Sequence, residues 1–279
     1  MFPRTPPQTL YRRDAAHPQR LARARDDLAK GFTRWRLALA LAVLDIRNRY
    51  RGSVLGPFWL TLSTTVMISG IGLLYAQLFQ MPLSEYLPFL TVSLLLWTLI
   101  AQTVSEACSS LITAQAVIRQ LPLPYAVHVL RVVLRNAIVA AHNLPLIPVV
   151  FLISGVLPSW GALLALPGLG LIAVNAFAMG MLLGMICARF RDVQPIVASV
   201  MQLVFFLSPV LWKPELLKEM QVFLPLNPVF VLMETVRGPL LNGGASAVIW
   251  VCALLYTALA SALAFAFFVR FRARIAFWV

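Results

Sequence analysis

Side chains that could carry out acid–base chemistry are few in this sequence, and they are scattered. Four ionisable residues lie in or beside apolar stretches: Glu106, His128, His142 and Glu234. An ionisable residue at such a position is a candidate for function. For His142, which lies three residues before Pro145, we instead expect a bond to a backbone carbonyl of its own helix. Glu106 is expected to pair with Arg119 or Arg135.

Nothing in the sequence has the spacing of a catalytic or metal site. No cluster of His, Cys, Asp or Glu residues has metal-ligand spacing, and there is no Gly-x-Ser-x-Gly elbow. The cysteines number three, Cys108, Cys187 and Cys252. They are interpreted as small buried apolar side chains. No lysine follows the glycines of a phosphate-binding loop. We therefore expect no catalysis, no metal and no cofactor in this chain.

The composition identifies the environment of the protein. Of its 279 residues, 60% are hydrophobic and 12% are charged, and the mean hydropathy is +0.83. A soluble domain is about half apolar and about a quarter charged. The chain therefore cannot cover itself with polar surface, which excludes a cytosolic enzyme, a disordered tail and a secreted disulfide scaffold. The formal net charge of +13 is interpreted as a topology signal, with no nucleic-acid partner expected.

The apolar stretches predict the membrane spans. A crossing helix needs about 20 mainly apolar residues. Such stretches occur at about 58–79, 87–107, 136–154, 162–188, 195–212 and 247–269. They lack the period-two alternation of a membrane β-barrel. The sequence thus predicts an all-α integral membrane protein whose six transmembrane helices form one domain over residues 53–279.

The positive residues predict the orientation of these spans. If both termini are cytoplasmic, 20 of the 23 Lys and Arg residues lie on the inner side. The remaining three, Lys213, Lys218 and Arg237, then lie outside. This division agrees with the positive-inside rule. We expect the N- and C-termini in the cytoplasm and a multi-pass membrane protein.

Three further segments lie outside the six spans. Residues 1–32 are Arg-rich and polar, and we expect a mobile basic segment with no assigned role. Residues 33–52 predict an amphipathic helix in the headgroup layer, with Trp35 and Tyr50 at the boundary; a simple topological anchor is the alternative. Residues 214–240 are interrupted by Pro225 and predict re-entrant or outer helices between the fifth and sixth spans.

The end of the amphipathic segment carries a recognisable motif. Residues 49–59 read R-Y-R-G-S-V-L-G-P-F-W. They resemble the R-Y-x-x-S-x-L-G-x-x-W signature at the start of the first span in ABC-2 type permeases that export polysaccharides. That family includes the exporters of O-antigen, capsule and wall teichoic acid. The form in this sequence is more similar to the O-antigen and teichoic acid branches.

Three later segments resemble the same family and occur in the expected order. Residues 119–124 (R-Q-L-P-L-P) resemble a coupling segment between the second and third spans. Residues 188–193 (A-R-F-R-D-V) resemble a loop after the fourth span. Residues 208–212 (S-P-V-L-W) and 226–229 (L-N-P-V) resemble segments around the fifth span.

The resemblance implies a function and a set of partners. It implies the permease subunit of an ABC transporter in the bacterial inner membrane, which exports a lipid-linked polysaccharide, of O-antigen type, for lipopolysaccharide biosynthesis. It implies a homodimer that binds two copies of an ABC ATPase subunit, with ATP and Mg²⁺ held by that partner. Membrane lipids surround the assembly.

The resemblance also implies roles for particular residues. The coupling loops toward the ATPase contain Arg119, Gln120, Pro122, Pro124, Arg189, Arg191 and Asp192. The interface helix and the substrate entrance contain Trp35, Arg47, Arg49, Tyr50 and Arg51. The outer gate contains Trp212, Asn227 and Pro228.

Aromatic residues are the candidates for the substrate path. Aromatic rings offer a dry surface for the apolar faces of sugars and make few fixed hydrogen bonds. The preferred channel lining is Trp59, Tyr75, Phe79, Phe205 and Phe206. The alternative for each ring is a position in the interfacial belt or against lipid.

Two other functions stay open at this point. An ABC-2 exporter of a drug, haem or another small lipophilic substrate has the same architecture. An ion-coupled secondary transporter or a membrane-embedded lipid-modifying enzyme belongs to a different class. Proteins of that class should show clustered intramembrane acids or histidines, which this sequence lacks.

Overall fold

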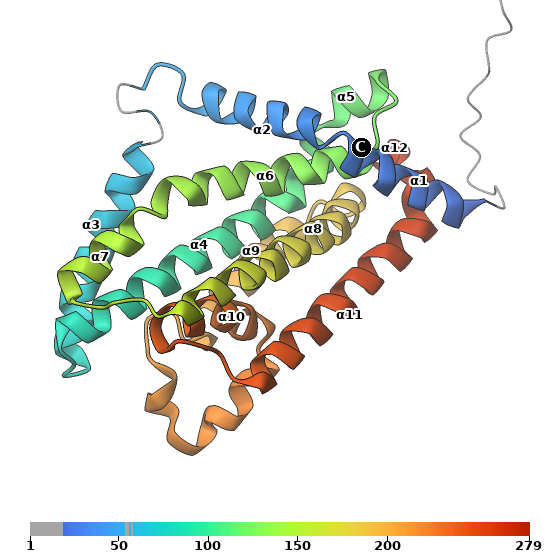
Figure 1. Ribbon diagram of the computed structural model, residues 1–279. Helices are drawn as coiled ribbons and strands as arrows, with labels where there is room; N and C mark the ends of the chain where they lie inside the picture. The colour runs from blue at the N-terminus through green and yellow to red at the C-terminus, as the bar shows by residue number, and fades with distance from the viewer. Residues whose placement is uncertain (1–18, 54–55, 57) are drawn as a thin grey trace, which may run out of the picture.

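The computed structural model describes residues 19–53, 56 and 58–279, and within them all regular structure is helical (Figure 1). The α-helices are α1 (Arg20–Thr33), α2 (Trp35–Arg49), α3 (Phe58–Leu78), α4 (Leu83–Thr113), α5 (Gln115–Gln120), α6 (Tyr125–Asn143), α7 (Leu146–Ser154), α8 (Ala165–Arg189), α9 (Val193–Leu207), α10 (Pro228–Asn242), α11 (Ala247–Phe271) and α12 (Ile275–Trp278). The 3₁₀ segments are η1 (Trp160–Leu164), η2 (Pro214–Leu226) and η3 (Arg272–Arg274). The predicted all-α class is confirmed. Residues 1–18, together with Val54, Leu55 and Pro57 of the first motif, lie outside the described residues.

Five helical segments are long and apolar enough to cross a membrane. They are Phe58–Leu78, Leu83–Gln120, Tyr125–Ser154, Trp160–Arg189 and Ala247–Trp278. A sixth crossing results only if η2 and α10, which meet at a bend of 110°, are counted as one span. The architecture is therefore that of an integral membrane protein with five or six spans.

The predicted fifth span at 195–212 needs correction. The helix there, α9, contains 15 residues, which rise about 22 Å and fall short of a hydrocarbon core of about 30 Å. It ends before Pro209, because a proline disfavours helical geometry in the residue that precedes it. The chain turns at this point and continues into η2 and α10.

The predicted third span at 136–154 is a broken helix that begins earlier, at Tyr125. Its two parts, α6 and α7, meet at Leu144 and Pro145. Just before the break, Nδ1 of His142 lies 2.7 Å from the carbonyl oxygen of Ile138. A carbonyl only accepts, so the ring donates. The expectation that His142 binds backbone is confirmed.

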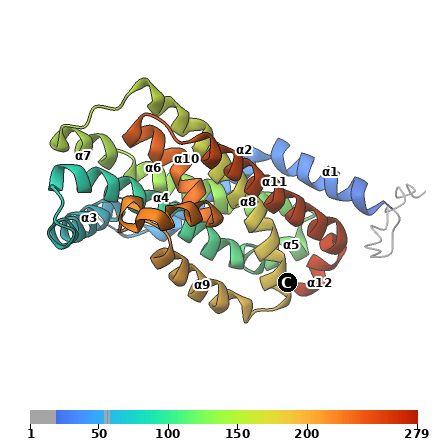
Figure 2. The same ribbon diagram turned by 90° about the horizontal axis from the view of Figure 1, so that it is seen from below.

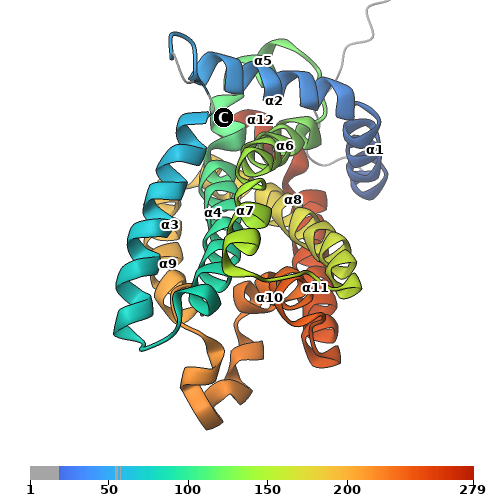
Figure 3. The same cartoon turned by 60° about the vertical axis from the view of Figure 1, so that its left-hand side comes forward.

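Helices α4 and α8 form the centre of the bundle. Most of their facing residues are buried, and α6, α10 and α11 pack around them. Helices α3 and α9 pack along α4 at one margin of the bundle (Figure 3). No residue of α9 is buried, and Figure 2 shows this helix at the edge of the molecule. Both marginal helices therefore expose long apolar faces.

The segments before the first span and after the last lie at one end of the molecule. Helices α1, α2, α5 and α12 gather there, whereas η2 lies at the opposite end (Figures 1 and 3). This arrangement agrees with α1 and α12, the first and last described helices, lying on one side of a membrane. Which side that is stays a prediction.

The predicted mobile segment 1–32 is wrong for its described part, because residues 20–33 form helix α1. This helix packs on α6 and α11. Its inner face consists of Ala24, Asp27 and Gly31, which are spaced three and four residues apart and so share one side of a helix. A Cβ atom on Gly31 would lie 2.5 Å from Cβ of Ala126. Small side chains therefore permit the close approach.

Candidate coupling face and substrate path

The first predicted coupling segment begins as a short helix. Arg119 and Gln120 end α5 rather than belonging to a loop, and the prolines follow. Pro122 is exposed, and Pro124 is buried at the start of α6. The two prolines end one helix and precede the next, because their rings restrict the backbone on both sides.

The second predicted coupling segment links α8 to α9. Arg189 is the last residue of α8. Arg191 and Asp192 follow, and Arg191 is exposed. Since α8 lies at the centre of the bundle, a displacement of this turn would be transmitted into the core.

The C-terminal residues connect these two segments. Nε and Nη2 of Arg119 donate to the backbone oxygen of Val279 at 3.2 and 2.6 Å. The guanidinium of Arg189 lies 5.3 Å from the ring centroid of Trp278. Residues 160 positions apart in the sequence are thus brought together. The sequence analysis did not predict this contact. The only local signal for it is the i, i+4 spacing of Ile275 and Val279, which places two apolar side chains on one face of a short helix.

A charge network attaches α2 to the bundle. Asp45 accepts hydrogen bonds from Nε of Arg131 at 2.7 Å and from Nη1 of Arg135 at 2.9 Å. Burial opposes ionisation of Asp45, but these two guanidiniums outweigh it and hold the pKa of Asp45 below its usual value. Glu106 accepts from Nη2 of Arg49 at 2.8 Å and from Nη2 of Arg135 at 2.6 Å. The predicted Glu106–Arg135 pair is confirmed, and Glu106–Arg119 does not form.

The network changes the interpretation of the interface helix. Arg49, which was assigned to the interface helix and the substrate entrance, pairs with Glu106 of α4. Trp35, Arg47 and Arg51 are exposed, as a headgroup contact requires. Tyr50 is half-buried. The face of α2 that meets the bundle is formed by Ala38, Ala42 and Ile46.

Aromatic rings of α3, of the turn that follows it and of α4 form one continuous row. The ring centroids of Tyr75 and Phe79 are 5.6 Å apart, and Phe79 is followed by Tyr86 at 6.1 Å. Tyr75 and Phe79 are half-buried, so part of each side chain stays accessible at the surface of the protomer. Trp59, nearer the other end of α3, is 57% exposed.

A second aromatic group lies on α9. Phe205 packs against Trp97 at 5.2 Å, and Phe206 contacts Phe205 at 5.3 Å. Phe206 is 63% exposed, whereas Phe205 is half-buried. The predicted lining is therefore divided within a protomer. Tyr75 and Phe79 lie at the end of α3 that leads to α4, Trp59 lies at its start, and Phe205 and Phe206 lie on α9. Of the five predicted rings, Trp59 and Phe206 are the most exposed.

The residues predicted at the outer gate hold the turn after α9. Nδ2 of Asn227 donates to the hydroxyl of Ser208 at 2.8 Å, while its Oδ1 caps α10 by accepting from the backbone N–H of Val229 at 3.0 Å. Nε1 of Trp212 donates to the carbonyl of Phe206 at 3.2 Å. Pro228 is the exposed first residue of α10. The S-P-V-L-W and L-N-P-V segments thus form one unit.

A buried arginine locks the same turn. Arg237 is 2% exposed. Its Nη1 donates to the hydroxyl of Ser93 at 2.9 Å and to the carbonyl of Pro209 at 2.6 Å. Its Nη2 donates to Glu234 at 2.6 Å. This residue was counted only as an outer positive charge in the sequence, because burial and partners depend on the tertiary structure.

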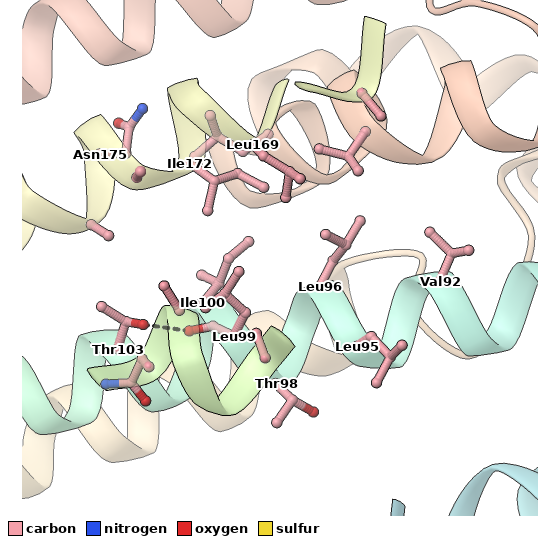
Figure 4. A pocket seen from close by; sticks show the side chains of 18 of the residues that line it. Val92, Leu95, Leu96, Thr98, Leu99, Ile100, Thr103, Leu169, Ile172 and Asn175 are labelled. Carbon is pink, nitrogen blue, oxygen red and sulfur yellow. Dashed lines mark hydrogen bonds between the residues drawn. The ribbon is translucent and has the colours of Figure 1, made fainter. Parts of the chain in front are cut away.

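A large apolar cavity lies elsewhere. It measures about 1070 Å³ and lies between α4 and α6 on one side and α8 and α11 on the other. Figure 4 shows side chains such as Leu96 and Ile100 of α4 facing Leu169 and Ile172 of α8 across it. The lining is overwhelmingly aliphatic, and none of the five predicted channel aromatics borders it. Such a wall suits hydrocarbon rather than a polar glycan.

Comparison with known proteins gives concordant matches. The sequence profile described as ABC-2 type transporter matches residues 36–241. The O-antigen export system permease protein RfbA of Myxococcus xanthus is 30% identical over 207 residues, covering 71% of this chain and 78% of the relative. A protein of the same name from Klebsiella pneumoniae is 22% identical over 212 residues, covering 74% and 81%.

Proposed function

The chain belongs to the ABC-2 type transporter family, and from this premise we propose that it is the channel-forming subunit of an ABC exporter for a lipid-linked polysaccharide of O-antigen type. The main support for this proposal is the similarity to a permease that is named for O-antigen export. This similarity extends over more than two thirds of both chains. The proposed substrate is thus inferred from the name of this relative, and the proposed substrate path is inferred from the structure of this chain.

A partner is required because members of this family are membrane subunits without catalysis of their own. We expect two copies of an ABC ATPase, which supplies ATP and Mg²⁺ binding, in a bacterial inner membrane. The exposed residues around Arg119 and Arg191, at the end of the molecule that holds α1, α2 and α12 (Figure 1), support docking there.

A homodimer is proposed because the large cavity of the protomer offers no polar path. That cavity is aliphatic, and α3 and α9 carry exposed apolar faces at the margin of the bundle. Two such margins facing each other would enclose a channel whose rings include Trp59 and Phe206. Aromatic rings let a sugar chain slide, because they make few fixed hydrogen bonds.

The mechanism follows from this arrangement. The segment around α2 admits the lipid-linked end of the glycan. Closure of the ATPases displaces the segments at 119–124 and 189–193. Because Arg189 ends the central helix α8, the push reaches the core, and α3 and α9 of the two protomers move apart. Rigid elements that move about a shared interface are usual in transporters.

The test is reconstitution. The chain and the ABC ATPase that co-purifies with it are placed in vesicles with a lipid-linked O-antigen, and the glycan that reaches the far side is measured. We expect export that requires ATP and stops when the ATPase is inactivated. Export driven by an ion gradient without the ATPase would identify a secondary transporter. ATP-driven movement of a small lipophilic compound, with the glycan unmoved, would identify the other alternative.

A further inference from the structure

The C-terminal segment Arg272–Val279, formed by η3 and α12, lies outside the residues 36–241 that match the family. It is nevertheless firmly held. Ile275 and Val279 are 0% and 3% exposed, and they share an apolar cluster with Ile118 of α5 and Ala188 of α8. The segment is therefore anchored between the helices that precede the two proposed coupling segments.

Specific contacts attach α12 to both of those segments. Arg119 donates two hydrogen bonds to the backbone oxygen of Val279. The guanidinium of Arg189 lies 5.1 Å from the ring centroid of Phe190 and 5.3 Å from that of Trp278. One guanidinium from each coupling segment is thus engaged by adjacent residues at the C-terminal end of the chain.

The other face of α12 is open and apolar. Phe277, which points away from the buried pair Ile275 and Val279 because of the helical spacing, is 72% exposed. Each coupling segment adds an exposed apolar side chain beside its contact with α12: Leu121 at 53% and Phe190 at 52%. The two coupling segments and η3 also contribute exposed arginines: Arg119, Arg189, Arg191 and Arg274. Apolar side chains with a charged rim are typical of protein interfaces.

We propose that the ABC ATPase subunit docks on a composite surface made of α12 and the two coupling segments, with Phe277 as its central apolar contact. The inference rests on the proposed function, because that function supplies the partner. Because charges across an interface are usually complementary, we expect the ATPase to present acidic side chains around an apolar depression that accepts Phe277. Since α12 contacts both segments, a push on it moves them together.

The experiment uses the whole chain and compares two phenylalanines, one in α12 and one in η2. These two elements lie at opposite ends of the molecule (Figure 1). Phe277→Ala removes the proposed contact, and Phe223→Ala in η2 removes a ring of similar exposure, 63%. We expect the Kd for the ATPase to rise about tenfold for Phe277→Ala, as for an interface hot spot, and to stay unchanged for Phe223→Ala. Both chains are also reconstituted to measure export, which should fall for Phe277→Ala.

A second pair of variants does not depend on loss of the ring. An environment-sensitive fluorophore is attached to Phe277→Cys and, as control, to Phe223→Cys; the unaltered chain gives the background from its own cysteines. The ATPase should change the emission only at position 277. The inference is overturned if Phe277→Ala leaves the Kd unchanged and the ATPase does not alter the emission at position 277. It is also overturned if quenchers in the lipid quench the fluorophore at position 277 while the ATPase is bound. An unaltered chain that binds no ABC ATPase contradicts the proposed function itself.

Discussion

Arg272 and Asp27 join the two ends of the described chain. Nε and Nη2 of Arg272 donate to Oδ2 of Asp27 at 3.0 and 2.9 Å, while Oδ1 of Asp27 accepts the backbone N–H of Ala126 at 3.3 Å. Asp27 is 2% exposed. One carboxylate therefore holds together α1, the start of α6 and the end of α11. Both members of the pair lie outside the family match.

Removing this carboxylate should release α1. Asp27→Ala leaves Arg272 without its partner, and breaking a buried pair costs about 3 kcal/mol or more. We expect trypsin to cleave faster at the arginines of α1 in the detergent-solubilised protein. Asp26→Ala is the matched control, because Asp26 is exposed and its ion pair is with Lys30, at 2.7 Å on the same helix. Equal cleavage rates for the two variants would show that α1 does not depend on Asp27.

The aspartates of α1 and α2 should respond to pH in opposite directions. Burial raises the pKa of Asp27 above its usual 3.8, in spite of Arg272. Folding therefore favours the protonated form of Asp27. This pH-dependent part of the docking of α1 is complete below about pH 3.8 and is lost as the pH rises through the raised value, whereas the hydrogen bonds of the carboxylate to Arg272 and Ala126 remain. The pKa of Asp45 is lowered, so its contribution is present above about pH 3.8 and disappears only as the pH falls through the lowered value.

Hydrogen exchange, corrected for intrinsic rates, measures both effects. Between pH 8 and about pH 4, protection of α1 should increase and protection of α2 should stay constant. Asp27→Asn should remove the pH dependence of α1, since the amide does not titrate in this range. Protection of α1 that decreases on acidification would contradict a raised pKa for Asp27.

Adjacent rings on α9 should separate transport from stability. Phe206 is 63% exposed, so Phe206→Ala should change the free energy of unfolding by no more than about 0.5 kcal/mol yet slow glycan export several-fold. Phe205→Ala, which removes a contact with Trp97, should lower the stability as well. Leu207→Ala, at 69% exposure, is the control for a non-aromatic loss. Wild-type export by Phe206→Ala would remove this ring from the path.

The turn after α9 should depend on the buried Arg237. Arg237→Met keeps the length of the side chain but leaves Glu234 without its guanidinium partner and the Pro209 carbonyl without its donor. Loss of one partner from a buried pair costs about 3–5 kcal/mol, so the melting temperature in detergent should fall by several degrees. Lys218→Ala, at an exposed position of η2, should leave it unchanged. A melting curve for Arg237→Met that matches Lys218→Ala would argue against this lock.

Much of the architecture was accessible from local patterns. Runs of about 20 apolar residues predict membrane helices because the bilayer core has a nearly constant thickness. Apart from the run at 195–212, each predicted span has a counterpart among the long apolar segments of the structure. Short motifs in the right order predicted the family. The break after His142 and the end of α5 before Pro122 follow from proline chemistry, which also acts locally.

The tertiary structure decided what depends on distant partners. Whether residues 195–212 cross the membrane depends on where the chain turns, and that turn is held by Asn227 and Arg237, which arrive from later in the sequence. Whether residues 20–32 are ordered depends on Ala126 and Arg272. The surface around Phe277 exists only because Arg119 and Arg189 reach the C-terminal residues. A sequence specifies which side chains can pair, but the free energy of burial and ion pairing is realised only when packing removes both partners from solvent.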